Sequence, residues 1–116
     1  VFGADRDLPD VQARLNPYSP ALYRLLRAVA ALAGSRVDRV QLCGILPQLP
    51  GVMPVLLGLG YRRFSVDVVH APYLARAVAR RTAAQDRRLA EAVCAAESGP
   101  AVADLLEAWH PARRPQ

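Results

Sequence analysis

Hydrophobic residues recur at intervals of three and four along much of the chain, which is the spacing of one face of an α-helix. The first such segment begins at Pro20, because Ser19 is a good helix cap and proline suits the first helical position, and Gly34 ends it. Its leucines and valine should face a core and its arginines the solvent: Leu22, Leu25, Leu26, Val29 and Leu32 inward, Arg24 and Arg27 outward. Further helices are predicted over residues 50–59, 71–81 and 82–97, with Thr82 as a cap, and from the Ser98-Gly99-Pro100 break to about Trp109.

Two other segments carry the β-branched and aromatic residues typical of strands, Val37–Cys43 and Tyr61–Val66. The predicted order is helix, strand, helix, strand, helix, followed by two terminal helices. Strands that alternate with helices indicate βαβ units and a parallel sheet, so the predicted fold class is α/β. Two parallel strands do not make a self-sufficient core, and we expect that the chain is a fragment or that other chains complete the sheet.

Composition narrows the class of protein. The chain has 116 residues, 53% of them hydrophobic, which suits one domain or part of a larger one and is too apolar for a disordered chain. The uncharged stretch over residues 40–61 could span a bilayer by length, but its three prolines and four glycines would break a membrane helix repeatedly. With no secretory signal and only two cysteines, the sequence predicts a cytoplasmic chain without a membrane partner.

The basic residues raise the question of nucleic-acid binding. The net charge is +5, and arginine pairs occur at 62–63, 80–81, 87–88 and 113–114. These pairs are spread over several predicted elements, and no recognised nucleic-acid-binding motif accompanies them. We therefore interpret them as solvated helix faces and expect no nucleic-acid partner.

Four short segments, in this order and spacing, resemble a known family. They are ADR at residues 4–6, LNPYSP at 15–20, VQLCG at 40–44 and PVLLGLGYRRFSV at 54–66. Together they are similar to the C-terminal end of the barrel in phosphoenolpyruvate (PEP)-utilising enzymes, above all the enzyme I-type PEP–protein phosphotransferases of bacterial sugar transport. The resemblance covers roughly residues 2–97, and the whole set is far more specific than any one of its motifs.

The resemblance implies a (β/α)8 barrel, of which this chain would supply the last two strands with their helices. Residues 1–97 would form this part of the PEP-binding barrel, residues 98–110 a terminal helix and residues 111–116 a tail. For the intact enzyme it also implies magnesium, with ligands outside this chain, a histidine-phosphorylatable carrier protein as partner, and a homodimer.

Three residues would carry the implied chemistry: Arg6 would hold the PEP phosphate, Cys43 would protonate enolpyruvate at carbon 3, and Gly44 would let the backbone approach the ligand. An ordinary thiol has a pKa of about 8.5, so it is protonated at neutral pH and can donate when positioned. An arginine fork suits phosphate oxygens. The alternatives are a small packed residue at a strand end for Cys43 and a surface ion pair with a neighbouring aspartate for Arg6.

The second thiol and the two histidines are interpreted as residues without a chemical role. Cys94 lies on an alanine-rich helix face, where a cysteine packs as a small apolar residue. His70 follows the second predicted strand without a partner in the pattern, and His110 lies in the tail, where we expect it to be solvated.

The sequence departs from the family pattern in the loop after Cys43 and Gly44. Ile45 stands where the family has an acidic residue, and Pro47-Gln48 replaces alanine and glycine. The phosphohistidine domain and the magnesium-binding carboxylates of the family would lie before Val1. Two functions remain open: the C-terminal segment of a PEP–protein phosphotransferase, inactive alone, or a degenerate, non-catalytic barrel remnant that acts as a dimerisation or partner-binding module.

Overall fold

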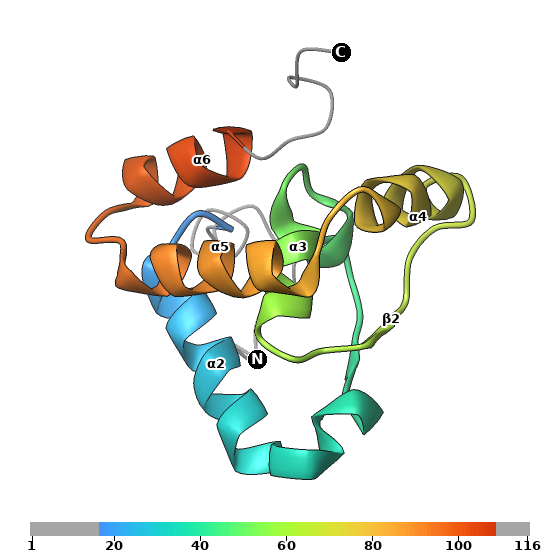
Figure 1. The fold of residues 1–116 in the computed structure, drawn as a ribbon, viewed down its shortest axis with the longest axis horizontal. Helices are drawn as coiled ribbons and strands as arrows, with labels where there is room; N and C mark the ends of the chain where they lie inside the picture. Colours follow the sequence, from blue (N-terminus) through green and yellow to red (C-terminus); the bar gives the residue numbers. More distant parts are fainter. Residues whose placement is uncertain (1–16, 109–116) are drawn as a thin grey trace, which may run out of the picture.

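The structure is a computed structural model, and it describes residues 17–108 of the chain. The described part is an α/β fold, mostly helical, with two parallel strands, which confirms the predicted class (Figure 1). Its elements in chain order are helix α2 (Pro20–Ala33), 3₁₀ helix η1 (Gly34–Arg39), strand β1 (Gln41–Leu42), 3₁₀ helix η2 (Leu46–Gln48), helix α3 (Val52–Gly58), strand β2 (Arg63–Phe64) and helices α4 (Ala71–Ala79), α5 (Ala83–Ala95) and α6 (Gly99–Ala108).

The two strands are parallel, as predicted, but they are much shorter than the sequence pattern indicated. Gln41 pairs with Arg63 and Leu42 with Phe64. The prediction of a strand from Val37 was wrong, because Gly34–Arg39 continues from α2 as a 3₁₀ helix and the chain becomes extended only at Val40. Val37 packs against the core although it lies in a 3₁₀ turn. A partly buried valine in such a turn produces the same local hydrophobic pattern as a strand residue.

The helix boundaries follow the capping signals of the sequence. Helix α2 begins at Pro20 and ends at Gly34, whose φ of 57° is positive. Thr82 caps α5 in a reciprocal pair with Gln85: the Gln85 N–H donates to Thr82 Oγ1 at 3.1 Å, and the Thr82 N–H donates to Gln85 Oε1 at 2.9 Å. The prediction that Thr82 caps a helix is therefore confirmed.

The uncharged stretch at residues 40–61 contains the most deeply buried helix of the structure, α3. Every residue from Val52 to Leu56 is buried, and α3 packs mainly against α5 and also contacts α4 and η2 (Figure 1). None of the helices within residues 17–108 is long and apolar enough to cross a membrane. The hydrophobicity of this stretch is explained by burial among other helices.

The apolar stripe of α2 only partly meets this core. Leu22 and Leu26 are buried as predicted, but Leu25 is 39% exposed and Leu32 is 89% exposed, so the expectation that both face inward was wrong. The first half of α2 crosses α5, and the second half of α2 extends away from α5 toward η1 (Figure 1). The last turn of α2 therefore carries a leucine without a covering element among the described residues.

Hydrogen bonds made by the side chains of Arg24 and Tyr61 connect α2 to other parts of the fold. The Arg24 guanidinium, predicted to face solvent, donates to the carbonyls of Cys94 at 2.7 Å and Ala96 at 2.6 Å, where α5 ends. The hydroxyl of Tyr61, which is fully buried, donates to the Leu26 carbonyl at 2.6 Å. Burial raises the pKa of Tyr61 above its usual value.

Two glycines let α3 lie against its neighbours at backbone distance. A Cβ atom at Gly58 would overlap the carbonyl group of Asp86 in α5 and would lie 2.9 Å from the Cβ of Ala90. A Cβ at Gly51 would overlap the carbonyl oxygen of Leu106 in α6. The close contacts of α3 with α5, and of the turn before α3 with α6, are therefore possible only without side chains at these two positions.

We expect Gly58→Ala to lower the free energy of unfolding by about 1–3 kcal/mol, because the added methyl group meets backbone that cannot turn aside. The measurement is urea denaturation of the protein that contains this chain. Ala84→Ser, which adds one atom at an exposed position in the first turn of α5, is the control and should change stability by less than about 0.5 kcal/mol. Equal midpoints for Gly58→Ala and wild type would contradict the close contact.

Candidate functional site

The carboxyl ends of the two parallel strands lie side by side and bring Cys43 next to Ser65. Cys43 directly follows β1 and Ser65 directly follows β2. The Ser65 N–H donates to the Leu42 carbonyl at 2.9 Å, which continues the pairing to the end of the strands. The Cys43 thiol is free and exposed. We call the residues that follow the strands, 43–48 and 65–70, the carboxyl edge.

Gly44 gives the first loop of this edge its shape. Its φ is 92°, a conformation that residues with a Cβ rarely adopt. The chain turns there directly after the thiol and enters η2, in which Pro47 is among the most deeply buried residues of the structure. The turn therefore places backbone without a side chain directly after Cys43.

Gln48 joins the two loops of the carboxyl edge. Its side-chain Nε2 donates to the Gly44 carbonyl at 3.2 Å, and its Oε1 accepts a hydrogen bond from the Asp67 N–H at 3.3 Å. The sequence showed Gln48 only as a departure from a family pattern. A glutamine four residues after a glycine, in a turn that contains proline, is the one local signal that could have indicated a contact with the Gly44 carbonyl.

The other residues singled out in the sequence do not join Cys43 within the described part of the chain. Arg6 and His110 lie outside the described residues. His70 is exposed and directly precedes α4. Cys94 is 2% exposed within the hydrophobic core, which confirms that it packs. Burial raises the pKa of the Cys94 thiol, against the opposing effect of the Arg27 and Arg24 guanidinium groups.

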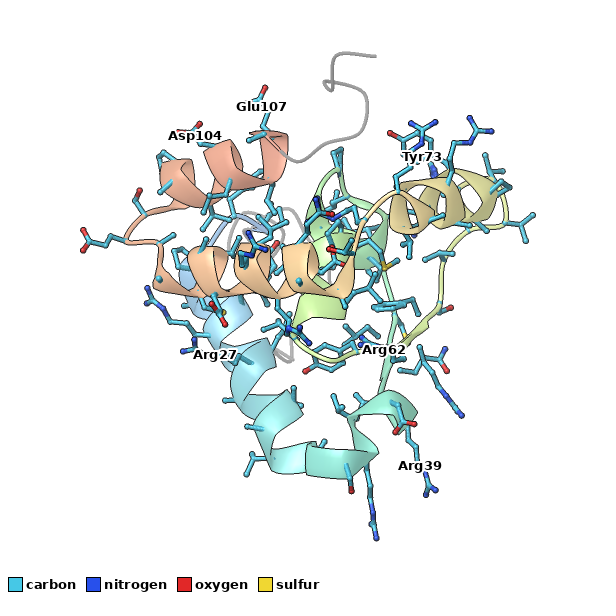
Figure 2. All side chains as sticks on the ribbon, in the orientation of Figure 1. Arg27, Arg39, Arg62, Tyr73, Asp104 and Glu107 are labelled. Carbon is cyan, nitrogen blue, oxygen red and sulfur yellow. The ribbon has the colours of Figure 1, made fainter. Side chains whose placement is uncertain are left out.

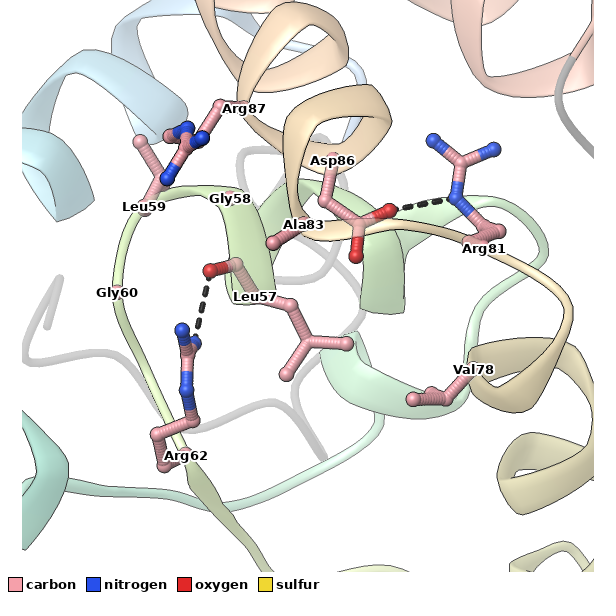
Figure 3. A pocket seen from close by; sticks show the side chains of 10 residues that line it. All are labelled: Leu57, Gly58, Leu59, Gly60, Arg62, Val78, Arg81, Ala83, Asp86 and Arg87. Carbon is pink, nitrogen blue, oxygen red and sulfur yellow. Dashed lines mark hydrogen bonds and ion pairs between the residues drawn. The ribbon is translucent and has the colours of Figure 1, made fainter.

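A cleft of about 410 Å³ lies elsewhere, between the turn after α3, the end of α4 and the start of α5 (Figure 3). Arg62 borders it just before β2 and donates to the Leu57 carbonyl at 2.8 Å. This position is at the amino end of β2, whereas barrel active sites lie at the carboxyl ends of strands. The cleft is therefore separate from the edge that carries Cys43.

A buried ion pair lines the same cleft. Arg81 Nε lies 2.5 Å from Asp86 Oδ1, and their side chains are only 3% and 9% exposed. The prediction that the arginine pairs lie on solvated helix faces was therefore wrong for Arg81, although its neighbour Arg80 is exposed. The pair joins the turn after α4 to the first turns of α5, where a carboxylate also suits the helix dipole.

Comparison with known proteins identifies the family to which this chain belongs. Residues 1–84 match the family described as PEP-utilising enzyme, PEP-binding domain. The chain belongs to the PEP-utilising enzyme family. The match includes both strands, α3, α4 and the whole carboxyl edge, so the recognised part of the family domain is the part that holds Cys43.

The relatives of this chain are much longer proteins. It is 29% identical to multiphosphoryl transfer protein 1 of Escherichia coli over 111 aligned residues. The alignment covers 96% of this chain and 13% of that protein. It is 34% identical over 98 residues to the PEP–protein phosphotransferase of Streptomyces coelicolor, 84% of this chain and 18% of the relative. The corresponding protein of Haloferax volcanii is 31% identical over 106 residues, 91% of this chain and 19% of its own length.

The chain thus spans less than a fifth of the curated relatives it matches. No solved structure matches it significantly. Within residues 17–108, no group of three or more histidine, cysteine, aspartate or glutamate side chains could hold a metal ion.

The two thiols should differ strongly in reactivity. We expect iodoacetamide to alkylate the exposed Cys43 at least about ten times faster than Cys94, because Cys94 is buried and burial disfavours its thiolate. The measurement is mass spectrometry of the peptides after timed alkylation of the folded protein. Alkylation in 6 M guanidinium chloride is the control and should make the two rates similar. Similar rates in the folded protein would contradict the positions described for the two cysteines.

Proposed function

We propose that this chain is the C-terminal segment of a PEP–protein phosphotransferase, and that its carboxyl edge binds PEP and protonates enolpyruvate. The single observation that carries the proposal is the exposed thiol of Cys43, next to a glycine with positive φ, where two parallel strands end in a chain of the PEP-utilising family. In this proposal β1 and β2 are the last two strands of a (β/α)8 barrel, completed by the rest of the intact protein.

The proposed chemical role of Cys43 is that of a general acid. After the phosphoryl group has left PEP for a histidine of the intact protein, the product is the enolate of pyruvate, which is nucleophilic at carbon 3. Carbon 3 takes the proton of the Cys43 thiol while the electrons on the enolate oxygen form the carbonyl at carbon 2. The thiolate that remains is protonated again by water, which the exposure of Cys43 allows.

The proposal gives substrate contacts to two further residues. Gly44 lets the backbone approach PEP beside the thiol, which its φ of 92° supports. Arg6 binds the PEP phosphate through its planar guanidinium group. In the intact enzyme, magnesium is held by residues outside this chain, the phosphate passes on to a histidine-phosphorylatable carrier protein, and the protein is a homodimer.

A second candidate function is a non-catalytic barrel remnant that binds a partner or dimerises. The observation in its favour is the apolar character of the carboxyl edge. Ile45, in the place of an acidic residue, is 58% exposed, and Val68 and Val69 are 87% and 84% exposed. An edge that binds only a protein would need these residues and not the thiol. PEP-dependent phosphorylation of the intact protein distinguishes the two functions.

In the intact protein, Cys43→Ala should slow pyruvate formation by about 10²–10⁴-fold, the range for loss of a positioned general acid. The measurement is pyruvate release coupled to NADH oxidation by lactate dehydrogenase. Cys94→Ala is the matched control: it removes the packed cysteine and should leave the rate within about twofold at temperatures where the protein is folded. Wild-type turnover in Cys43→Ala would rule out its role as the acid.

Arg6→Ala should weaken PEP binding by about 1.5–3 kcal/mol, because a charge-assisted hydrogen bond to phosphate is lost. Isothermal titration calorimetry with the intact protein measures this change. Arg39→Ala is the control, since Arg39 is exposed at the end of η1, before β1 and thus at the opposite end of the strand from Cys43 (Figure 2). If both variants bind PEP equally well, Arg6 is a surface residue and the assignment fails.

A further inference from the structure

The backbone pairing of the two strands ends before it reaches the residues proposed to carry chemistry. Within residues 17–108, the last backbone hydrogen bond between the strands runs from the Ser65 N–H to the Leu42 carbonyl. Cys43 and Gly44 follow this last bond, and so does the loop after Ser65. A proton donor must be held in place to within a fraction of an ångström, so another contact has to position this loop.

The Gln48 side chain supplies such a contact. A primary amide can donate and accept at once, and Gln48 does both: it donates to the Gly44 carbonyl at 3.2 Å and accepts from the Asp67 N–H at 3.3 Å. One side chain thus spans from the loop after β1 to the loop after β2, two residues beyond Ser65. It extends the connection between the strands to the point where Cys43 lies.

Gln48 is itself held by its surroundings. Its backbone N–H donates to the Ile45 carbonyl at 2.9 Å, which closes the turn of η2. The preceding Pro47 is almost completely buried, and its ring restricts the backbone. The backbone of Gln48 is therefore fixed, and its side chain extends from a defined position toward the Gly44 carbonyl and the Asp67 N–H.

We infer that Gln48 is a positioning residue, which sets the Cys43–Gly44 segment against the loop after β2 and so holds the thiol in line with carbon 3 of the bound enolpyruvate. The inference rests on the proposed function. Because Gln48 acts on the position of the acid and not on the phosphate, it should influence kcat much more than the KM for PEP. A displacement of about 1 Å at a reacting group can reduce a rate by about 10²-fold.

Two substitutions separate the two hydrogen bonds of Gln48. Gln48→Ala removes both. Gln48→Glu keeps an oxygen that can accept from the Asp67 N–H but places a carboxylate oxygen against the Gly44 carbonyl, where a donor is needed. Gln41→Ala is the matched control, because Gln41 is an exposed glutamine of β1 on the other side of Cys43 from Gln48.

The experiment measures kcat and KM of the intact protein and, in parallel, hydrogen exchange by mass spectrometry of the peptide that covers residues 65–70. We expect Gln48→Ala and Gln48→Glu to lower kcat about 10–100-fold with KM within about twofold of wild type. Exchange of the Asp67 amide should become at least about threefold faster in Gln48→Ala, while Gln48→Glu and Gln41→Ala should exchange like wild type.

Unchanged kcat in both Gln48 variants, in an enzyme that Cys43→Ala disables, would overturn the positioning role while the proposed function stands. A loss that appears in KM and not in kcat would also overturn it, since Gln48 would then act on binding. Unchanged Asp67 exchange in Gln48→Ala would show that the connection between the loops does not exist. An intact wild-type protein that releases no pyruvate from PEP would overturn the proposed function itself, and the exchange measurement would still decide whether Gln48 joins the loops.

Discussion

The enclosure of α3 is the constraint on which the rest of this structure depends. This short helix connects the two strands, and it is buried from Val52 to Leu56. This close packing requires two positions without side chains: Gly58 lies against the backbone of α5, and Gly51, just before α3, lies against the backbone of α6.

The position of β2 follows from the same packing. The turn after α3 needs Gly60, whose φ is 110°, and it leads directly into Tyr61, which is fully buried and donates to the Leu26 carbonyl of α2. Two residues later β2 begins and pairs with β1. The packing of α3 therefore fixes where β2 starts, and through the pairing it also fixes where Ser65 stands beside Cys43.

Elements with strong local signals could be predicted from the sequence. Thr82 followed by Gln85 specifies a helix start through two short-range hydrogen bonds, and Ser19-Pro20 suits the start of α2 without a side-chain bond to confirm it. Features that depend on distant groups could not be predicted in this way. Leu32 continues the apolar period of α2, yet it is exposed because no described element covers the end of that helix. Arg81 lies next to exposed Arg80, yet it is buried against Asp86.

The same division applies to the candidate site. The end of the first strand of a βαβ unit is recognisable in sequence, so the place of Cys43 at the carboxyl edge could be predicted. The bridge made by Gln48 could not, because it depends on which main-chain groups of a second loop lie within reach. The arginine proposed for the phosphate lies outside the described residues, so its place stays a prediction from resemblance.

The segment that resembles PEP-utilising enzymes therefore contains two kinds of residue. Gly58, Gly60 and the buried residues around them serve the packing of α3, and a chain could keep them with or without catalysis. The departures from the family pattern all fall in one loop, at Ile45 and Pro47-Gln48. That loop is well anchored: its proline is buried and its glutamine makes two hydrogen bonds. The bridge at Gln48 orders this edge, and an ordered edge would serve either proposed function, because both a positioned acid and a partner-binding surface need a loop of fixed shape.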